Sequence, residues 1–180
     1  MQTHTKAKIQ NDFNGLLIQI PAGKNILVLI FFTIWLCGWF YFAVDVFETL
    51  QKPEEHRNYF LMIWLAGWTL GGIQVFRSIL WALFGKEIIN ISNYEIKLKD
   101  STLGFGKTHR FSIHELKSIE FNQPSVSEES DYPGKILLHR NSQVYSYGTN
   151  LDEIEAKSII DLIKNKIPHL KHSPITTNET

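Results

Sequence analysis

Two long apolar runs separated by a short polar loop constrain this chain more than any other feature. The first, from Ile26 to Val44, contains no charged residue across about 19 positions, which at a rise of about 1.5 Å per residue is nearly the thickness of a bilayer's hydrocarbon core. The second, from Tyr59 to Phe76, is almost as long and continues beyond Arg77 as a further apolar stretch. We expect two membrane-spanning helices, joined as an antiparallel hairpin over residues 26–84.

The average composition hides these runs. A mean hydropathy of −0.10 and a net charge of +0 resemble the values of a water-soluble protein, because the two runs are averaged with a polar remainder. Neither half of the chain has the basic excess of a nucleic-acid-binding protein, so we expect no nucleic-acid partner. The single cysteine, Cys37, lies in the first run, which excludes an intrachain disulfide and a metal site built on several cysteines.

Charges near the ends of the runs predict the orientation in the membrane. The first run starts too late and is too long for a cleaved signal peptide, and no small-residue cleavage site follows it. The loop of residues 45–58 carries two basic residues, Lys52 and Arg57. More basic residues flank the other ends of the runs: Lys6, Lys8 and Lys24 before the first, and Arg77, Lys86, Lys97 and Lys99 after the second. The positive-inside rule then predicts a multi-pass protein of the cell membrane with both termini in the cytoplasm.

Small residues in the runs are candidates for helix packing. Gly67 and Gly71 stand at the GxxxG spacing, with Gly72 beside them and Gly38 in the first run. Such residues let two helix backbones approach closely in lipid, either between the two spans of one chain or between two copies. Both alternatives stay open.

Three residues are candidate anchors at the membrane interface, namely Lys24, Arg77 and Trp81. Long basic side chains near the end of a span can reach lipid phosphates, and tryptophan favours the headgroup level. An ionisable residue in a span can also mark a functional site, and this is the alternative for Arg77.

After Gly85 the apolar pattern changes from helical to alternating. Six short strands are predicted, followed by a helix that starts at Asn150, with Glu153 at the capping-box position, and ends before Pro168. The expected strands cover residues 86–92, 93–100, 107–113, 117–122, 135–140 and 143–148. The N-terminal segment, residues 1–25, contains one more alternating stretch at Leu16 to Ile20, which we expect to add to the sheet edge. Residues 169–180 are expected to be a disordered tail.

Four stretches of the chain carry a resemblance to a family. They are NGLLIQIPAGKN before the first run, FGKEIINISNYEIKLK after the second, FSIHELKSIEF, and YSYGTNLDEIEAKSIIDLI. The chain resembles bacterial membrane proteins with two N-terminal transmembrane helices and a cytoplasmic pleckstrin-homology-like domain, whose roles are mostly unassigned. The resemblance implies an α+β membrane protein: a transmembrane helical hairpin followed, over residues 85–168, by a small antiparallel β-barrel or sandwich capped by a C-terminal helix. Such a domain normally has seven strands before its helix, and Leu16 to Ile20 would supply the one missing from our six.

No motif in the sequence indicates catalysis. The phosphate-binding loop, dinucleotide fingerprint, nucleophile elbow and zinc-protease motif are all absent. The histidines of the strand region, His109, His114 and His139, are not at metal-ligand spacing. We therefore expect a protein that is not an enzyme, with no catalytic residue, cofactor or metal.

Four basic residues are candidates for contact with lipid headgroups: Lys97, Lys99, Lys107 and Arg110. The hairpin would hold them near the membrane, where each cation adds to the attraction of anionic lipid. The alternative is that they form an ordinary solvated face.

Two functional hypotheses remain. In the first, the chain is a membrane-anchored interaction or scaffold module whose pleckstrin-homology-like domain contacts a protein partner or a second copy. In the second, it is an accessory subunit of a membrane transporter or membrane enzyme with a site between the spans. The spans contain few polar residues, essentially Thr33, Thr69 and Gln74, and this favours the first hypothesis.

Overall fold

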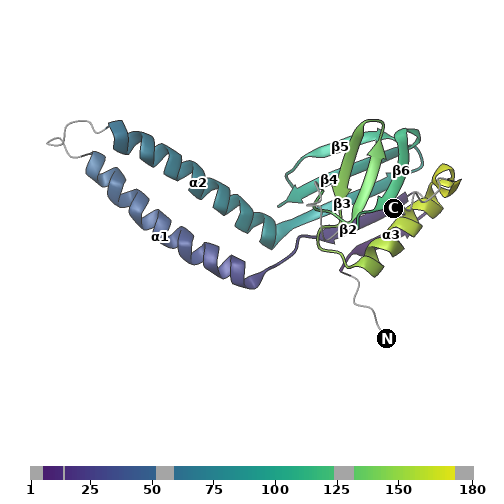
Figure 1. Cartoon of the computed structure of the whole chain (residues 1–180), viewed down its shortest axis with the longest axis horizontal. Helices are drawn as coiled ribbons and strands as arrows, with labels where there is room; N and C mark the ends of the chain where they lie inside the picture. The colour runs from purple at the N-terminus through teal and green to yellow at the C-terminus, as the bar shows by residue number, and fades with distance from the viewer. Residues whose placement is uncertain (1–5, 14, 52–58, 124–131, 173–180) are drawn as a thin grey trace, which may run out of the picture. The chain divides into compact units, whose positions relative to one another are not determined.

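The computed structural model describes residues 6–13, 15–51, 59–123 and 132–172 (Figure 1). The chain divides into two compact units. One contains the described residues of Met1–Gly23 and Gly85–Thr180, and the other is Lys24–Phe84. The described residues of the N-terminal segment up to Gly23 thus belong to the same unit as the domain after Gly85, whereas Lys24 and Asn25 belong to the unit of the helices.

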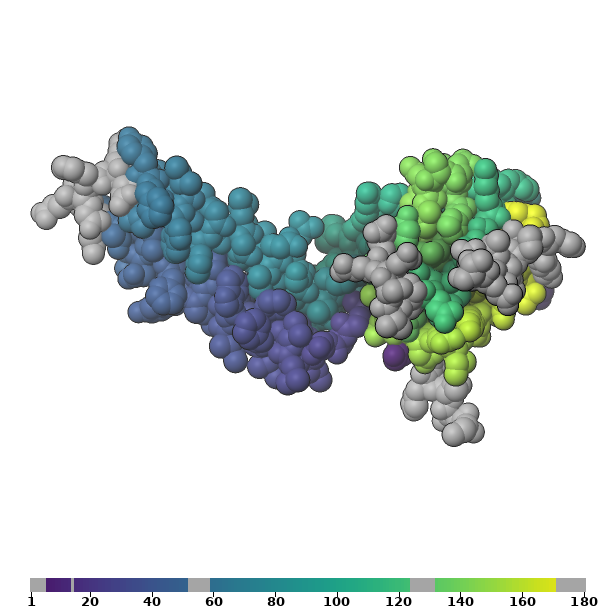
Figure 2. Space-filling model, in the orientation of Figure 1, coloured from purple at the N-terminus to yellow at the C-terminus, as the bar shows by residue number. Residues whose placement is uncertain are grey.

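The second unit is a pair of long apolar helices. Helix α1, Ile26–Leu50, is capped by Asn25, whose side chain accepts a hydrogen bond from the Val28 N–H at 3.3 Å. Helix α2 is Tyr59–Phe84, and Figure 2 shows the side chains of the two helices in contact. By length and composition both helices can cross a membrane. Helix α1 continues beyond Val44, so the loop expected from residue 45 begins only after Leu50, and residues 52–58 lie outside the described part.

A five-stranded antiparallel sheet forms the larger part of the other unit. Its strands follow one another in chain order: β1 Lys8–Asp12, β2 Gly15–Pro21, β3 Gly85–Ser92, β4 Glu95–Thr102 and β5 Thr108–Ser112. The strand expected at Leu16 to Ile20 is confirmed as β2, and it pairs with β3 from Gly15↔Ser92 to Pro21↔Lys86. Strand β1, which the sequence did not predict, covers the other edge of β2.

The remaining three strands form a second sheet. It consists of β6 Leu116–Phe121, β7 Ile136–Arg140 and β8 Gln143–Tyr147, and a short 3₁₀ turn, η1 Ile113–Glu115, joins it to β5. Within β3 to β8 the six strands predicted after Gly85 are all confirmed. The ends differ by at most two residues.

Helix α3, Glu153–Lys166, follows the second sheet. Its N-cap is Asp152, which forms a capping box with Glu155, so the prediction of Asn150 and Glu153 for these two roles was wrong. The N-cap lies two residues later than expected, because the Asp152 side chain accepts from the Glu155 N–H at 2.8 Å. The Asn150 amide donates to the Pro21 carbonyl at 3.3 Å and so joins two segments far apart in the chain.

One hydrophobic core joins the two sheets and α3. Alternation along β2 buries Leu16, Ile18 and Ile20, each at most 1% exposed. Other fully buried residues come from β3, β4, β6, β7 and α3: Ile89, Ile91, Ile96, Leu98, Leu116, Ile136, Leu138, Ile159 and Ile163. A 3₁₀ turn, η2 Pro168–His172, adds buried Leu170, so residues 169–172, which were expected to belong to a disordered tail, are structured; residues 173–180 lie outside the described part.

Candidate functional site

The clearest polar constellation lies where β3 and β4 approach the end of β8. Glu87 of β3 and Asp100 of β4 are cross-strand partners, and Glu87 is 8% exposed. Glu87 Oε2 accepts from the Gly148 N–H at 2.5 Å, and its Oε1 accepts from the Thr149 hydroxyl at 3.0 Å. The buried hydroxyl of Tyr147 donates to Asp100. Two neighbouring carboxyl groups of the first sheet therefore bind the segment that leaves the second sheet.

Burial shapes the protonation of this cluster. Desolvation is the main cause that raises the pKa of Glu87, and the hydrogen bonds from Gly148 and Thr149 oppose it. Desolvation also raises the pKa of Asp100, against the lowering effects of His109, Tyr147 and Lys107. The pKa of Tyr147 is raised by its burial and by the nearby charge of Asp100 and then Glu87. The cluster can hold a proton on a carboxyl group more readily than free carboxylates can.

The contacts of this cluster indicate a structural role. Both oxygens of Glu87 are occupied by donors from Gly148 and Thr149, and Gly148 has a φ of +82°, which favours glycine. The carboxylate thus fixes a tight turn against β3. Within residues 6–13, 15–51, 59–123 and 132–172, no group of three or more acidic, histidine or cysteine side chains could hold a metal ion.

Sequence reasoning missed this cluster, although one signal was present. Glu87 occupies a core-facing position of β3, in register with Ile89 and Ile91, and a charged residue at such a position must find partners. Asp100 becomes its neighbour only through the register of β3 and β4, which the sequence did not define.

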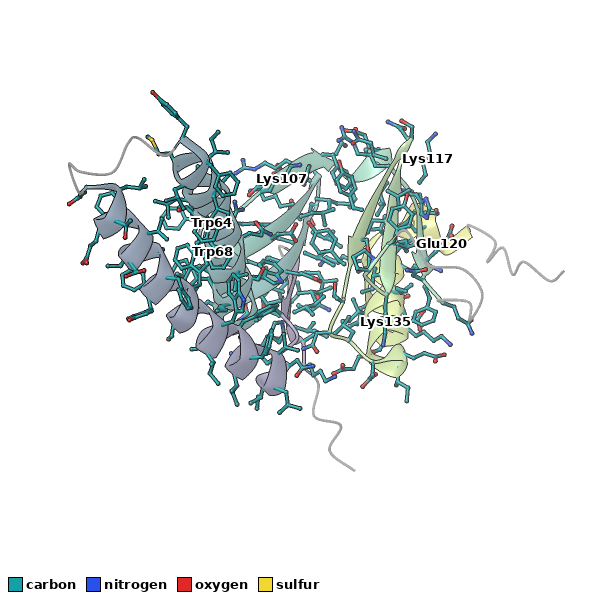
Figure 3. All side chains as sticks on the ribbon, turned by 60° about the vertical axis from the view of Figure 1, so that its left-hand side comes forward. Trp64, Trp68, Lys107, Lys117, Glu120 and Lys135 are labelled. Atoms are coloured by element: carbon teal, nitrogen blue, oxygen red, sulfur yellow. The ribbon has the colours of Figure 1, made fainter. Side chains whose placement is uncertain are left out.

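The predicted headgroup residues lie along β4 and β5, but most are partly engaged. Lys97 and Arg110 are cross-strand partners, and Lys99 faces Thr108. Lys97 Nζ lies 3.5 Å from Glu95 Oε2, and Lys99 Nζ donates to the Gly104 carbonyl at 2.7 Å. Since Ile96 and Leu98 are buried, Lys97 and Lys99 share the outer face of the sheet. Lys107 stands before β5 and is exposed (Figure 3).

A second polar contact joins β7 to the turn after β5. The Arg140 guanidinium lies 2.7 Å from Glu115 Oε2, and the Ser112 N–H donates to Glu115 Oε1 at 3.0 Å. The Ser112 N–H and then Arg140 hold the pKa of Glu115 below its usual value. Arg140 also lies over the Phe111 ring, 5.1 Å from its centre. The contact links the end of β5 and the η1 turn to β7, so it stabilises the junction between the sheets.

Each of the three histidines of the strand region, His109, His114 and His139, contacts a different residue, and none of these contacts is with another of the three. Their neighbours are Tyr145 for His109, with ring centres 5.0 Å apart, His169 for His114, at 6.1 Å, and Glu120 for His139, whose Nε2 lies 3.6 Å from Oε2.

In the hairpin, the packing glycine is Gly72. A Cβ built on Gly72 would lie 2.3 Å from the Trp39 ring, whereas one on Gly38, Gly67 or Gly71 would meet nothing within 4 Å. Of the four candidate packing glycines, Gly72 therefore lies in the contact between α1 and α2, and packing of Gly67 and Gly71 against a second copy stays a prediction. Gly67 and Gly71 lie on a face of α2 where an added Cβ would meet no atom within 4 Å, whereas the next residue, Gly72, faces Trp39.

Four tryptophans surround this contact. Trp39 Nε1 donates to the Trp68 carbonyl at 2.9 Å, and Trp68 Nε1 lies 3.5 Å from the Trp39 carbonyl. Trp64 stacks on Trp68 with ring centres 4.8 Å apart (Figure 3), and Trp35 lies 6.3 Å from Trp68. The indoles thus bind the two helices to each other.

Two hydroxyl groups in the helices donate to carbonyl groups of their own helix. Thr33 donates to the Leu29 carbonyl at 2.8 Å, and Ser78 donates to the Gln74 carbonyl at 3.0 Å. Such bonds use the hydroxyl proton, so these groups have less to offer a polar path.

The candidate anchors occupy the ends of the hairpin. Lys24 is exposed directly before the cap of α1, and Arg77 is exposed on the last part of α2, where Trp81 is half-buried. Their contact with a membrane interface stays a prediction.

Comparison with protein-family models and with curated proteins finds no match for this chain.

Proposed function

We propose that this chain is a membrane-anchored interaction or scaffold module. One observation carries the proposal: the sheet is built from chain segments on both sides of the hairpin. Strand β2 precedes α1 and pairs along its whole length with β3, which follows α2 directly. Such a domain is joined to the hairpin at two points of the chain: residues 22–25 connect β2 to α1, and α2 is followed directly by β3. Such an architecture suits a protein that keeps a binding domain close to a bilayer.

The sheet unit supports a pleckstrin-homology-like fold. Strands β2 to β8 are seven antiparallel strands followed by α3, the number that this fold normally has before its helix. Strand β1 is then an addition at the edge. In this proposal the domain acts by binding rather than by catalysis, since its two polar clusters bind the chain's own turns.

The proposed location is the cell membrane, with both termini in the cytoplasm. Paired strands must lie on one side of a membrane, so β2 and β3 require two spans that return to the same side. The basic residues near that side, Lys24, Arg77 and Lys86, favour the cytoplasm.

Site-specific photocrosslinking in native membranes tests the proposal. A photoreactive residue replaces Arg110 on the outer face of the first sheet, Lys117 on β6 (Figure 3), or Leu70 on α2, each in the full chain. Reproducible crosslinks from position 110 or 117 to one partner, or to a second copy, support the interaction module.

The same experiment also tests the alternative function, that of an accessory subunit of a membrane transporter or membrane enzyme. Crosslinks to a protein from position 70 alone would support an accessory subunit that acts through its spans. Position 70 suits this comparison because Leu70 is 69% exposed on α2. Crosslinks to lipid only, from all three positions, would contradict both readings.

A further inference from the structure

An exposed apolar turn connects β4 to β5. Leu103 is 57% exposed and Phe105 is 83% exposed, although both side chains are large and hydrophobic. The turn has a defined shape: Thr102 N–H donates to the Phe105 carbonyl at 2.8 Å, and Phe105 N–H donates to the Thr102 carbonyl at 3.0 Å. Two apolar side chains are thus held away from the core by a closed turn.

The backbone of this turn is specialised. Leu103, Gly104 and Gly106 have φ values of +53°, +91° and +155°. A bulky residue such as leucine rarely adopts a positive φ, and the conformation costs free energy. A Cβ on Gly106 would collide with the Asp100 carbonyl, so this position requires glycine. Packing inside the unit does not account for the exposed leucine and phenylalanine that this backbone presents.

The turn lies at the end of the sheet that continues into α2. Thr102, the last residue of β4, pairs with Gly85, the first residue of β3. Gly85 follows Phe84, the last residue of α2, without a connecting residue. Since cross-strand Cα atoms are about 5 Å apart, covalent continuity alone keeps the turn near the end of α2.

Basic residues accompany the apolar tip. Lys99 Nζ donates to the Gly104 carbonyl at 2.7 Å, within the turn itself. Lys107 directly follows the turn, and Lys86 is the second residue of β3. Two acids lie nearby: Asp100, which accepts a hydrogen bond from Tyr147 and interacts with the charge of Lys107, and its cross-strand partner Glu87, which is buried. Apolar side chains surrounded by lysines are the pattern of protein segments that enter a lipid interface.

We propose that the turn of residues 103–106 is a third membrane contact: Leu103 and Phe105 enter the lipid–water interface, and Lys86, Lys99 and Lys107 face anionic headgroups. The inference rests on the proposed function, because it requires α2 to end at a membrane surface. The occupant is the bilayer itself. Its boundary layer accepts apolar side chains, and its anionic headgroups match the charge of the three lysines.

The opposite end of the sheet provides a matched control. Tyr94, in the turn between β3 and β4, is 83% exposed, as Phe105 is. The two residues are separated by β4, which at about 3.4 Å per residue spans roughly 27 Å. A general attraction of exposed aromatic residues to lipid would affect both positions, whereas the proposed contact affects position 105 alone.

The experiment uses single-cysteine variants of the full chain in vesicles of phosphatidylcholine and phosphatidylglycerol. Phe105→Cys and Tyr94→Cys are each made with Cys37→Ser and labelled with a fluorophore whose emission reports polarity. We expect blue-shifted emission at position 105, and quenching by lipid-attached quenchers several-fold stronger than at position 94. Both effects should weaken in vesicles of phosphatidylcholine alone.

The native cysteine separates failure of this inference from failure of the proposed function. Cys37 is exposed on α1, so a label there in the otherwise unchanged chain reports whether the hairpin enters lipid. A label at 37 in lipid, with labels at 105 and 94 equally in water, overturns the inference alone. A label at 37 in water overturns the spanning hairpin as well.

A second measurement avoids the substitutions altogether. In the unmodified chain, spin-labelled lipids should broaden the ring signals of Phe105 several-fold more than those of Tyr94. Equal broadening of the two rings would also overturn the proposed contact, whatever the labelled variants do.

Discussion

Replacing Gly72 with alanine should weaken the contact between α1 and α2. The new Cβ would lie 2.3 Å from the Cε2 and Cζ2 atoms of Trp39. Carbon atoms in ordinary contact are about 3.5 Å apart, so the indole must move by roughly 1.2 Å. The ring cannot do so freely, because its Nε1 donates to the Trp68 carbonyl.

The neighbouring residue supplies the control for magnitude. Alanine is a better helix former than glycine by up to about 1 kcal/mol, and this gain applies to Gly71→Ala and Gly72→Ala alike. At Gly71 a Cβ meets nothing within 4 Å. Overpacking costs about 1–3 kcal/mol, and an interhelical hydrogen bond in a membrane is worth about 0.6 kcal/mol. We therefore expect Gly72→Ala to be less stable than Gly71→Ala by about 2–4 kcal/mol.

Tryptophan fluorescence measures this difference directly. All five tryptophans of the chain lie in α1 and α2, so selective excitation of tryptophan reports the hairpin and not the sheets. Equilibrium unfolding of the full chain in mixed micelles, with increasing sodium dodecyl sulfate, gives the free energy of each variant. In a Trp39→Phe background the cost of Gly72→Ala should shrink, because the smaller ring leaves room for the methyl group. Equal stability of Gly71→Ala and Gly72→Ala would refute the assignment of Gly72 to the contact.

Three further expectations concern the sheets and the orientation. Ile18→Ala should destabilise the sheet unit by about 2–5 kcal/mol, and Leu17→Ala on the other face of β2 by much less, as measured by thermal unfolding followed by circular dichroism; equal effects would mean that β2 does not enter the core. Burial raises the pKa of Glu87, so its contribution to stability is complete below the unfolded-chain pKa and is lost as the pH rises through the folded-state pKa. Glu87→Gln should therefore gain stability relative to the wild type as the pH rises through that window, and a carboxyl-carbon titration that gives a pKa at or below the ordinary value would contradict this. Reporter fusions at the C-terminus should be active in the cytoplasm and insertions between the helices should not; cytoplasmic activity of the insertions would overturn the orientation.

The sequence predicted elements whose pattern is local. Alternation along β2, β3 and β4 places Ile18, Ile89 and Leu98 on one face, and a strand must bury that face. The two helices follow from length and hydrophobicity alone. Strand β1 was missed because it is a polar edge strand, and its pairing with β2, rather than its own composition, makes it a strand.

The candidate sites were less predictable, because they depend on which faces meet. The spacing of Gly67 and Gly71 gives a smooth helix face, but it does not indicate whether that face meets α1 or another surface. The contact at Gly72 depends on the rotation of α2, and hence on where Trp39 packs. In the same way, Glu87 and Asp100 became a cluster only through strand register.

The pairing of β2 with β3 also has a consequence for folding. In the other strand pairs at most 14 residues connect the two strands, whereas Pro21 and Lys86 are paired although α1 and α2 separate them. Closing a long flexible loop costs entropy. A formed hairpin removes most of that cost, because it brings the end of β2 close to the start of β3. Strand β2 should therefore gain amide protection only after the hairpin forms. Pulse-labelled hydrogen exchange during refolding should show slower protection of Leu16–Ile20 in Gly72→Ala than in Gly71→Ala, while β7 and β8 are protected at the same rate in both variants. Equal delay in all strands would mean that the sheets form as one unit, independently of the order that the chain connectivity implies.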